Sequence, residues 1–353
     1  MKVTKINWKG KSRAEWSKQR KELEGIGDTE SVRIGASDVS VILGTNKWKC
    51  PARLFHHLTG FHDSFFMTER TISGHLMEDI IKRRWEALDT EDEMATLENV
   101  MEGTRLRKIK PAKFFMVNSL YPYSFVSLDM VPDGEQFSPF TGEKYEPNTP
   151  NEMKHTNKDY YRRWNNGIAD QYYSQVQYQM AVSGTNLCVF HVLVDGVEYH
   201  VKEIERSQDY IDSMMSQVED FAKIVMVGKR ALHLMRAAKS DSEREHFQNI
   251  YDQVTPEPTY LEDDLNLVNE IYSSPIDDDI MIKQGDLDDL HLMQRYIKAT
   301  SLENKLKDLK FNLRSRLVIS CGGKEGIEVG GYKMLNRRGR ANKRNHFSIK
   351  EAK

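Results

Sequence analysis

The sequence predicts an α/β (α+β) fold, with a mixed central sheet flanked by helices and a helical C-terminal arm. Three observations indicate this fold. β-rich runs at residues 114–119 and 123–131 are followed by segments whose apolar residues recur at helical spacing. Asp195-Gly196 joins two further β-rich runs, and such a dipeptide is a strong hairpin signal. From about residue 236 to 320 the pattern is mainly helical.

Two short helices are predicted near the N-terminus. Ser12 and Glu15 form a capping box that opens the first helix, which Gly25 ends. In "GASDVSVILG", Ser37 is expected to be the N-cap of the second helix, and Gly44 its end.

A third short helix is predicted to begin at Pro51 and to close at Gly60. A longer helix follows, because the apolar residues of segment 72–88 recur at helical spacing. Residues 89–112 are polar and acidic, and they show no period that predicts an element.

Strands and helices then alternate. "FFMVNS" and "YSFVSLDMV" predict a pair of strands, and the turn residues Pro132-Asp133-Gly134 follow them. "NEMKHT" is read as a further strand, and a helix is expected from about Asp170 to Val182, closed at Gly184. A long amphipathic helix follows the hairpin.

Three regions are therefore expected. Residues 1–235 would form the core with its N-terminal helices, residues 236–320 a helical arm, and residues 321–353 a small basic β element. The arm carries a leucine stripe suited to a helical hairpin: Leu302, Leu306, Leu309, Leu313 and Leu317.

Composition excludes several classes of protein. No apolar run approaches the roughly 20 residues that cross a bilayer, and no apolar segment follows the basic N-terminus, so neither a membrane anchor nor a signal peptide is expected. Cys50, Cys188 and Cys321 lie far apart, which argues against disulfides, structural zinc and iron–sulfur clusters. A cytoplasmic protein is expected.

The charges are unevenly distributed, although the net charge is −2. Segments 1–25 and 331–353 each hold eight Lys and Arg residues, whereas segment 256–290 holds eleven acids and only Lys283. This separation would let one surface meet an anionic polymer, or it could simply reflect solvated surface charge.

A carboxylate site is predicted around "NEMKHT". In a strand, Glu152 and Lys154 would point to the same face. Asp129, read as lying in a strand on a face shared with Phe125, Ser127 and Val131, would be costly to bury unless it binds a cation or is hydrogen-bonded. Two such carboxylates suit Mg²⁺ or Mn²⁺. Lys154 could then align and help deprotonate a water, or neutralise a phosphate.

Helical residues extend this site. Glu78 offers a third acid, and Gln175 and Gln179 lie one helical turn apart after the E-x-K strand. Taken singly, each is more often a solvated surface residue, and E-x-K also occurs at Glu303 and Glu351. Only the order and spacing of the whole set favour a common site.

At this point the residues resemble a known family. The order of helix-Glu, strand-Asp, strand E-x-K and helix-Gln is similar to the PD-(D/E)xK nuclease superfamily, whose core is restriction-endonuclease-like. Within it the chain looks like the YqaJ-like viral recombinases, relatives of the phage lambda exonuclease. The resemblance covers about residues 14–225 and rests on these stretches: "RIGASDVSVILG", "GHLMED", "VSLDMV", "NEMKHT" and "YYSQVQYQMAVSGT".

The resemblance implies roles for particular residues. Metal ligands would be Glu78, Asp129, Glu152 and the Met153 carbonyl, and Lys154 would be the catalytic lysine, with Gln175 supporting it. A 5′-phosphate pocket would include Ser37 and Arg20, the latter in W-x-x-x-R with Trp16.

Two departures from the family pattern leave alternatives open. Extra residues between Arg20 and Ser37 make Arg33 a rival for the phosphate pocket. Met130 and Asn151 replace a glycine and an aliphatic residue, which weakens the predicted E-x-K strand and makes Asp133 a rival of Asp129.

The implied activity is a Mg²⁺-dependent (or Mn²⁺-dependent) 5′→3′ exonuclease that degrades one strand of linear double-stranded DNA and leaves 3′ single strands. Such an enzyme would work in phage or prophage recombination in the bacterial cytoplasm, with a single-strand annealing protein, as a possible ring-forming trimer or other homo-oligomer. An endonuclease of the same superfamily and a catalytically silent DNA-end-binding protein are the alternatives.

Two other groups of residues are expected to be structural. The histidines at positions 56, 57, 62 and 75 are read as ordinary core or surface residues. Packing is favoured over base stacking for the aromatic side chains of "DYYRRW".

Overall fold

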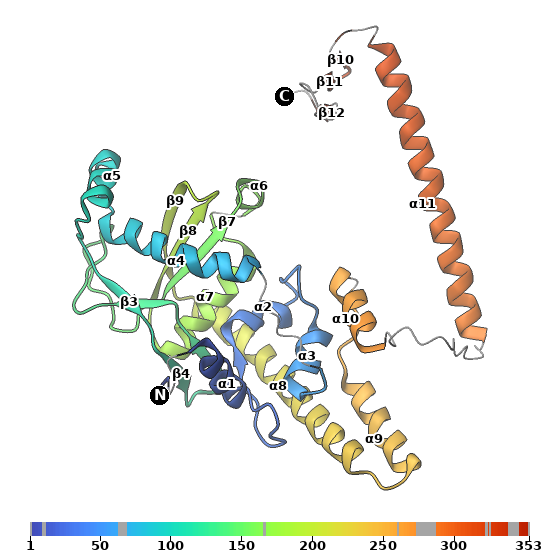
Figure 1. Cartoon of the computed structure of the whole chain (residues 1–353), viewed down its shortest axis with the longest axis horizontal. Helices are drawn as coiled ribbons and strands as arrows, with labels where there is room; N and C mark the ends of the chain where they lie inside the picture. Colours follow the sequence, from blue (N-terminus) through green and yellow to red (C-terminus); the bar gives the residue numbers. More distant parts are fainter. Residues whose placement is uncertain are drawn as a thin grey trace. The chain divides into compact units, whose positions relative to one another are not determined.

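The computed structural model describes residues 2–8, 12–62, 69–164, 167–259, 261–272, 287–321, 324, 326–337 and 346–351. The chain divides into two compact units, Met1–Ser273 and Ser274–Lys353. The elements of the first unit are shown in Figure 1 and are, in chain order, β1 (Val3–Asn7), α1 (Arg13–Leu23), β2 (Ile34–Gly35), the 3₁₀ turn η1 (Ala36–Asp38), α2 (Val39–Ile42), α3 (Pro51–Thr59), α4 (Glu69–Ala87), α5 (Glu93–Glu102), β3 (Ile109–Pro111), β4 (Phe114–Asn118), β5 (Tyr121–Ser127), β6 (Met130–Pro132), β7 (Asn151–Thr156), α6 (Lys158–Tyr161), α7 (Asp170–Ser183), β8 (Leu187–Val194), β9 (Glu198–Glu205), α8 (Gln208–Ala237), α9 (Asp241–Val254) and α10 (Glu262–Tyr272).

Two sheets build the first unit, and both are mixed. One has the order β1-β4-β5-β2, and the other has the order β3-β6-β7-β8-β9. In the five-stranded sheet β7 and β8 run parallel while the other pairs are antiparallel. The hairpin between β8 and β9 turns at Asp195 and Gly196, both with positive φ, as the sequence predicts. The predicted α/β class is confirmed.

Helices cover both faces of the five-stranded sheet (Figure 1). On one face Ile81 and Trp85 of α4 pack with Met153 and Leu193 of the sheet. On the other face Met180 of α7 packs in a second apolar cluster. Successive residues of a strand point to opposite faces of the sheet. Each helix therefore packs against its own set of apolar side chains.

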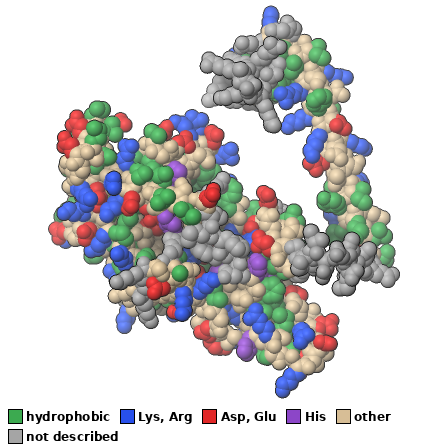
Figure 2. Space-filling view, viewed as in Figure 1, with side chains coloured by type: hydrophobic (Ala, Val, Ile, Leu, Met, Phe, Trp, Pro, Cys, Tyr) green, Lys and Arg blue, Asp and Glu red, His purple; other side chains and the backbone are tan. Residues whose placement is uncertain are grey.

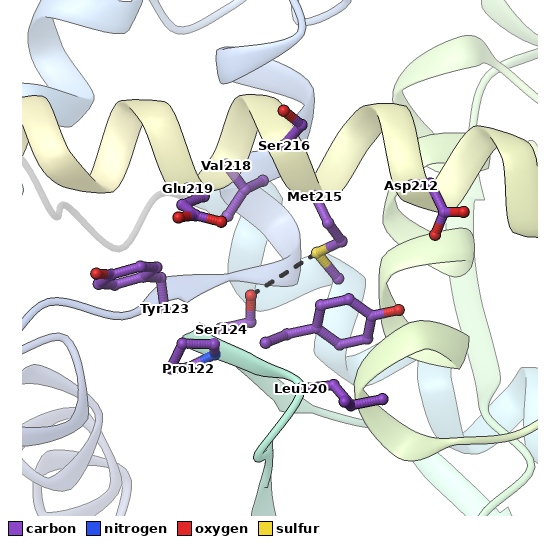
Figure 3. Close-up of a pocket in the computed structure, with 10 residues that line it drawn as sticks. Leu120, Pro122, Tyr123, Ser124, Asp212, Met215, Ser216, Val218 and Glu219 are labelled. Carbon is purple, nitrogen blue, oxygen red and sulfur yellow. Dashed lines mark hydrogen bonds between the residues drawn. The ribbon is translucent and has the colours of Figure 1, made fainter. Parts of the chain in front are cut away.

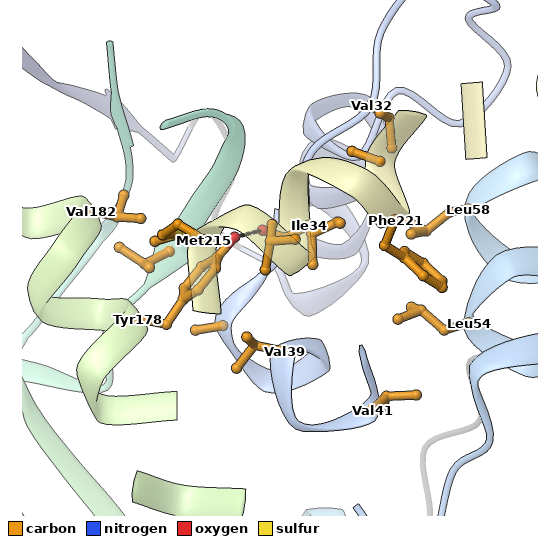
Figure 4. Close-up of a cluster of buried hydrophobic side chains, with 14 of the residues drawn as sticks. Val32, Ile34, Val39, Val41, Leu54, Leu58, Tyr178, Val182, Met215 and Phe221 are labelled. Carbon is orange, nitrogen blue, oxygen red and sulfur yellow. Dashed lines mark hydrogen bonds between the residues drawn. The ribbon is translucent and has the colours of Figure 1, made fainter. Parts of the chain in front are cut away.

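The largest apolar cluster joins α7 and α8 to the N-terminal elements (Figure 4). Within it the Tyr178 hydroxyl donates to the Ile34 carbonyl at 2.7 Å, which ties α7 to β2. Helices α3 and α8 approach so closely that a Cβ at Gly228 would lie 2.5 Å from the Phe55 ring. Gly228 is therefore needed for this contact.

Several sequence expectations are confirmed and two are corrected. The capping box of Ser12 and Glu15 is formed. Residues 89–112 contain a helix that the sequence analysis missed, α5, with Asp92 as N-cap and Gly103 in the left-handed conformation after its end. Both are recognisable cap signals, which the lack of apolar periodicity obscured. Ser37 is not an N-cap, because it lies inside η1.

The predicted boundary at residue 235 is also shifted. It falls inside α8, and α9 and α10 belong to the first unit. The reason is a buried contact: the hydroxyl of Tyr251 in α9 lies 2.7 Å from His56 Nδ1 and 2.9 Å from Thr59 Oγ1, both in α3. Burial lowers the pKa of His56 to about 4, so this histidine is a neutral core residue.

The second unit contains α11 (Leu287–Ser320) and a small antiparallel sheet of β10 (Gly326–Val329), β11 (Tyr332–Arg337) and β12 (His346–Glu351). The predicted leucine stripe lies on α11 and is exposed, with Leu306 65% accessible. Green apolar and blue basic side chains alternate along this helix in Figure 2. No helix among the described residues is both long enough and apolar enough to cross a bilayer.

Candidate catalytic site

The E-x-K motif lies in a strand whose neighbours hold it in place. All six residues of β7 pair with β8, from Asn151 with Val189 to Thr156 with Val194. This pairing overrides the weak strand propensity of the polar sequence. Glu152 and Lys154 point to the same side, as the two-residue period requires, and face α7.

The carboxylate of Glu152 is buried, with 1% of the residue exposed, and it is fully hydrogen-bonded. Its Oε1 accepts from Gln175 Nε2 at 2.7 Å and from the ammonium of Lys154. Its Oε2 accepts from Gln179 Nε2 at 2.6 Å. The two glutamines, one turn apart on α7, therefore fix the orientation of the carboxylate.

Asp129 lies next to the Glu152 strand, but it is not in the strand where it was expected. It does not lie in a strand but at the bend between β5 and β6, where the chain leaves the four-stranded sheet and enters the five-stranded one. Phe125 and Val131, which were expected to share its face, consequently belong to different apolar clusters. Asp129 Oδ2 accepts from the backbone N–H of Met153 at 3.0 Å, next to Glu152.

The two carboxylates influence each other. Burial and the nearby charge of Glu152 raise the pKa of Asp129 well above its usual value, although Lys154 opposes the shift. Burial would lower the pKa of Lys154, but the charges of Glu152 and Asp129 outweigh it and raise that pKa. Lys154 is thus a cation at neutral pH, suited to donating a hydrogen bond rather than to accepting a proton. The pocket holds two acids and one cation.

Asp133, the rival of Asp129, lies elsewhere. It is about half exposed and forms an ion pair with Lys110 of β3 at 2.9 Å. That hydrogen bond lowers the pKa of Asp133. The geometry therefore favours Asp129 as the partner of Glu152.

Glu78 and the Met153 carbonyl are the other two predicted metal ligands. Glu78 Oε1 lies 2.7 Å from His75 Nδ1 on α4, and its charge contributes to the raised pKa of Asp129. Among the described residues, however, no three His, Cys, Asp or Glu side chains are close enough to hold one ion together. The ligand roles of Glu78 and of the Met153 carbonyl stay predictions.

Arg20 and Ser37, predicted for the phosphate pocket, are brought together. Arg20 Nη2 lies 3.3 Å from Ser37 Oγ, and the same guanidinium pairs with Glu24 and Asp38 at 2.7 and 3.1 Å. Lys49 pairs with Asp38 at 2.9 Å. We call Arg20, Glu24, Asp38 and Lys49 the N-terminal charge cluster. Its two cations and two acids balance.

The glycine of "RIGASD" has a physical role here. A Cβ at Gly35 would lie 3.1 Å from Arg20 Nη2 and 3.2 Å from the Phe125 ring. A larger residue would therefore push Arg20 away from η1. Ser37 does not cap α2, which contains only four residues, so in a phosphate pocket Ser37 would act through its exposed hydroxyl.

The extra residues before Ser37 do not displace Arg20. They form a loop whose Gly25 and Ser31 carbonyls accept hydrogen bonds from Lys229 Nζ of α8, at 2.6 and 2.7 Å. Within the described chain, the rival Arg33 makes no ion pair or hydrogen bond to the cluster or to Ser37. Arg20 is therefore the arginine that contacts Ser37, and its role in a phosphate pocket stays a prediction.

Asn151 and His191 form a polar pair behind the site that the sequence does not predict. Asn151 is the one residue of β7 that pairs with β6, opposite Met130. Its Oδ1 lies 3.1 Å from Nε2 of His191 in β8, and the Nδ1 of that histidine lies 2.8 Å from the Tyr199 hydroxyl. Burial lowers the pKa of His191 to about 3, so the ring is neutral. Asn151, which replaces the family's aliphatic residue, thus has a specific partner in this chain.

Residues 15–186 match the sequence profile of the YqaJ-like viral recombinase domain family. The match covers slightly less than half of the chain. The matched segment runs from α1 to the end of α7, so it includes Arg20, Ser37, Asp129, Glu152 and Gln179. Strands β8 and β9 and everything after them lie outside the match.

Known relatives are distant. The chain is 27% identical over 224 residues to the uncharacterized protein YqaJ of Bacillus subtilis (strain 168), and the match covers 62% of this chain and 58% of that protein. An alkaline exonuclease (LHK-Exo) from Laribacter hongkongensis shares 15% identity and a TM-score of 0.42, covering 58% of this chain and 93% of that one. A phage related exonuclease from Haemophilus somnus 129PT shares 13% identity and a TM-score of 0.35, covering 55% of this chain and 94% of that one. At these TM-scores the structural likeness supports no conclusion about this chain.

Proposed function

We propose that this protein is a divalent-metal-dependent deoxyribonuclease that degrades one strand of linear double-stranded DNA from its 5′ end. The observation that carries the proposal is the recessed pair of carboxylates, Asp129 and Glu152, with Lys154 beside them. The pair lies inside the matched recombinase domain. A recombinase needs single-stranded ends, and removing one strand would produce them.

The donor set fits a hard divalent cation. Mg²⁺ commonly takes one or two protein carboxylates and completes its shell with water and substrate phosphate oxygens. Asp129 and Glu152 would hold it. Burial and the charge of Glu152 raise the pKa of Asp129, and such an ion would offset the second of these. When bound, Mg²⁺ or Mn²⁺ supplies positive charge beside the scissile phosphate and makes a water more acidic.

The remaining residues would position the reactants. Gln175 and Gln179 hold the Glu152 carboxylate, and Lys154 would donate to a phosphate oxygen or to the attacking water. At the end of the DNA, Arg20 and Ser37 would bind the 5′-phosphate. Helix α7 links the two places, because Tyr178, which lies between the two glutamines, donates to Ile34 next to Gly35. Fixing the phosphate end would thereby select the bond that is cut.

The wider role follows from the family. A viral recombinase domain supports action in phage-type recombination by strand annealing, in the cytoplasm of a bacterial host, with a single-strand annealing protein as partner. A ring-forming homo-oligomer would keep the enzyme on its substrate and belongs to the same proposal.

The test uses the full chain with three substrates: linear duplex with 5′-phosphate, linear duplex with 5′-hydroxyl, and covalently closed circles. We expect degradation only with Mg²⁺ or Mn²⁺, fastest on the 5′-phosphorylated ends, and 3′ single strands as product. Closed circles degraded as fast as linear duplex would instead favour an endonuclease.

Glu152→Gln should lower the cleavage rate by on the order of 10³-fold or more while end binding persists. Asp133→Asn is the matched control, because Asp133 is an exposed acid outside the site. No cleavage by the unaltered chain, together with retained end binding, would favour the silent DNA-end-binding protein. Equal rates for Glu152→Gln and the unaltered chain would remove the site assignment.

A further inference from the structure

A pocket of about 900 Å³ opens at the end of β7, just after the E-x-K motif. It is lined by the residues that follow this motif, by the N-terminal parts of α4 and α7, and by the aromatic side chains of Trp48 and of Tyr160 in α6. Its volume falls in the range of small-molecule sites, roughly 300–1,000 Å³. The roles assigned to the catalytic residues do not use this pocket.

Helix α7 contacts both the catalytic residues and the pocket. Tyr172, Gln175 and Gln179 lie three and four residues apart and so share one helix face. The glutamines bond Glu152, and Lys154 Nζ lies 5.1 Å from the centroid of the Tyr172 ring, which lines the pocket. A DNA strand that runs from the carboxylates past Lys154 would therefore enter this pocket first.

The pocket has an aromatic wall. Trp48 lies 6.3 Å from Tyr160 between ring centroids, Tyr160 lies 5.8 Å from Trp164, and Trp164 lies 5.3 Å from Tyr172. The inner rings of this series are packed in the core, as the sequence predicts for "DYYRRW". Trp48 is different, because 62% of it is exposed.

The exposure of Trp48 is not the result of a loose loop. Asn46 Oδ1 accepts from the backbone N–H groups of Trp48 and Lys49 at 2.8 and 3.0 Å, and Asn46 Nδ2 donates to Ser40 Oγ at 3.1 Å. Lys49 is further held by Asp38 of the N-terminal charge cluster. The indole is thus presented to solvent by a fixed turn, which lowers the entropic cost of stacking on it.

The opposite wall leaves room for a planar group. Helix α4 contributes Ser73 and Gly74, and a Cβ at Gly74 would meet nothing within 4 Å. Two acids, Asp159 and Asp195, line the pocket with a single arginine, Arg163. Such a lining does not attract a phosphate, whereas an uncharged base loses nothing.

We propose that this pocket binds one unpaired nucleobase of the strand being processed, stacked on Trp48 with Tyr160 behind it. The proposal rests on the proposed function, since it supposes a nucleic acid at the carboxylate pair. Its physical reason is that a strand must leave its duplex before one phosphodiester can reach recessed carboxylates. Stacking on protein aromatics replaces the stacking on neighbouring bases that a base loses when its strand leaves the duplex.

A second pocket of the first unit has the wrong chemistry for this role. It lies between the β4–β5 hairpin and α8, has a volume of about 270 Å³, and Asp212 and Glu219 of α8 line it (Figure 3). Carboxylates without a neighbouring cation in the lining would repel the phosphates on either side of a base. Of these two pockets, the one at the end of β7 has an arginine beside its acids, an exposed aromatic ring and, through Tyr172, a contact with Lys154.

The experiment is a double-mutant cycle between protein and DNA. A single-stranded oligonucleotide with a 3′ fluorophore is titrated with the full chain in EDTA, so that no cleavage occurs, and anisotropy is measured. A single abasic site is stepped along the oligonucleotide from its 5′ end. The chains are unaltered protein, Trp48→Ala, Trp48→Phe and, as control, Phe140→Ala, which removes an exposed aromatic outside the pocket lining.

We expect Trp48→Ala to weaken binding roughly 5- to 100-fold, and Trp48→Phe and Phe140→Ala to weaken it less. One abasic position should weaken binding to the unaltered protein by a similar factor and have no effect on Trp48→Ala. Undiminished binding by Trp48→Ala overturns the proposal. So does an abasic penalty that persists in Trp48→Ala, because the base would then be held elsewhere.

Failure of the proposed function gives a different result. Cleavage is measured separately with Mg²⁺, in the unaltered protein and in Glu152→Gln. If no nuclease activity is found but the cycle shows coupling, the base site stands and the nuclease proposal fails. If cleavage depends on Glu152 but the cycle shows no coupling, the base site alone fails.

Discussion

Two groups of buried charges in this chain are made of the same residue types and behave in opposite ways. The N-terminal charge cluster holds Arg20 and Lys49 against Glu24 and Asp38. The catalytic group holds only Lys154 against Asp129 and Glu152. The two groups differ in the number of cations, two in the first and one in the second.

The shifts of pKa follow that count. Burial would raise the pKa of Glu24 and of Asp38, but their hydrogen bonds and the charges of Arg20, Lys49 and His57 outweigh burial and lower both pKa values. At Asp129 burial and Glu152 act in the same direction and raise the pKa. The charges of a balanced cluster stabilise one another, whereas an acid-rich cluster is short of a cation that a ligand could supply.

The largest expected contrast comes from removing one cation from each group. Lys154→Met should reduce the cleavage rate by roughly 10²- to 10³-fold, because it removes a preorganised charged donor from the reacting phosphate. Lys49→Met removes one half of a partly exposed ion pair and should cost about 1 kcal/mol or less in the free energy of unfolding. Rates come from single-turnover cleavage, and stabilities from urea denaturation. Similar rate losses in the two variants would show that the two groups do not differ in role.

A second contrast concerns acid stability. Glu24→Gln leaves Arg20 with Asp38 as its remaining acidic partner and should lower the free energy of unfolding by about 2 kcal/mol at pH 7. Because the folded pKa of Glu24 lies below its ordinary value of 4.5, the unfolded state takes up protons first as the pH falls. The stabilisation is thus complete at pH values above 4.5 and is lost as the pH falls through the folded pKa.

The measurement is urea denaturation of both chains between pH 7 and pH 3. The gap between unaltered protein and Glu24→Gln should narrow below pH 4.5. Glu30→Gln is the control, because Glu30 also pairs with an arginine, Arg230, but on the surface. A gap that stays constant with pH would mean that the charge of Glu24 contributes nothing.

These contrasts also show what the sequence could and could not predict. Glu152, Lys154 and Gln175 were placed correctly because the strand and helix periods fix which side chains share a face. Asp129 was expected in a strand, yet it lies at the bend where the chain changes sheets. No local pattern marks such a bend, since apolar residues on both sides of it are buried alike.

The sequence also could not predict contacts between residues that lie far apart along the chain. Asn151 looked like a weakness of the strand, because its partner His191 lies forty residues away. Arg20 looked uncertain because of the inserted loop, and the residue that anchors that loop, Lys229, lies in α8. The contact of Asn151 with His191 spans 40 residues and that of Lys229 with Gly25 spans 204, and sequence spacing alone cannot reveal either.

The smallest expected effect tests the comparison most directly. Asp129→Asn removes one of two like charges that are buried close together, while its side-chain oxygen can still accept from the Met153 N–H. In EDTA this variant should be more stable than the unaltered protein, by about 1 kcal/mol. Adding Mg²⁺ should stabilise the unaltered protein, because the ion binds only the folded carboxylate pair, and should leave Asp129→Asn unchanged. The order of stability therefore reverses when metal is added, and thermal unfolding with and without Mg²⁺ measures it.

Asp133→Asn, an exposed acid, should respond to Mg²⁺ as the unaltered protein does. If Asp129→Asn is destabilised in EDTA, or gains stability from Mg²⁺ like the unaltered chain, the repulsion between the two carboxylates is not what a bound cation relieves.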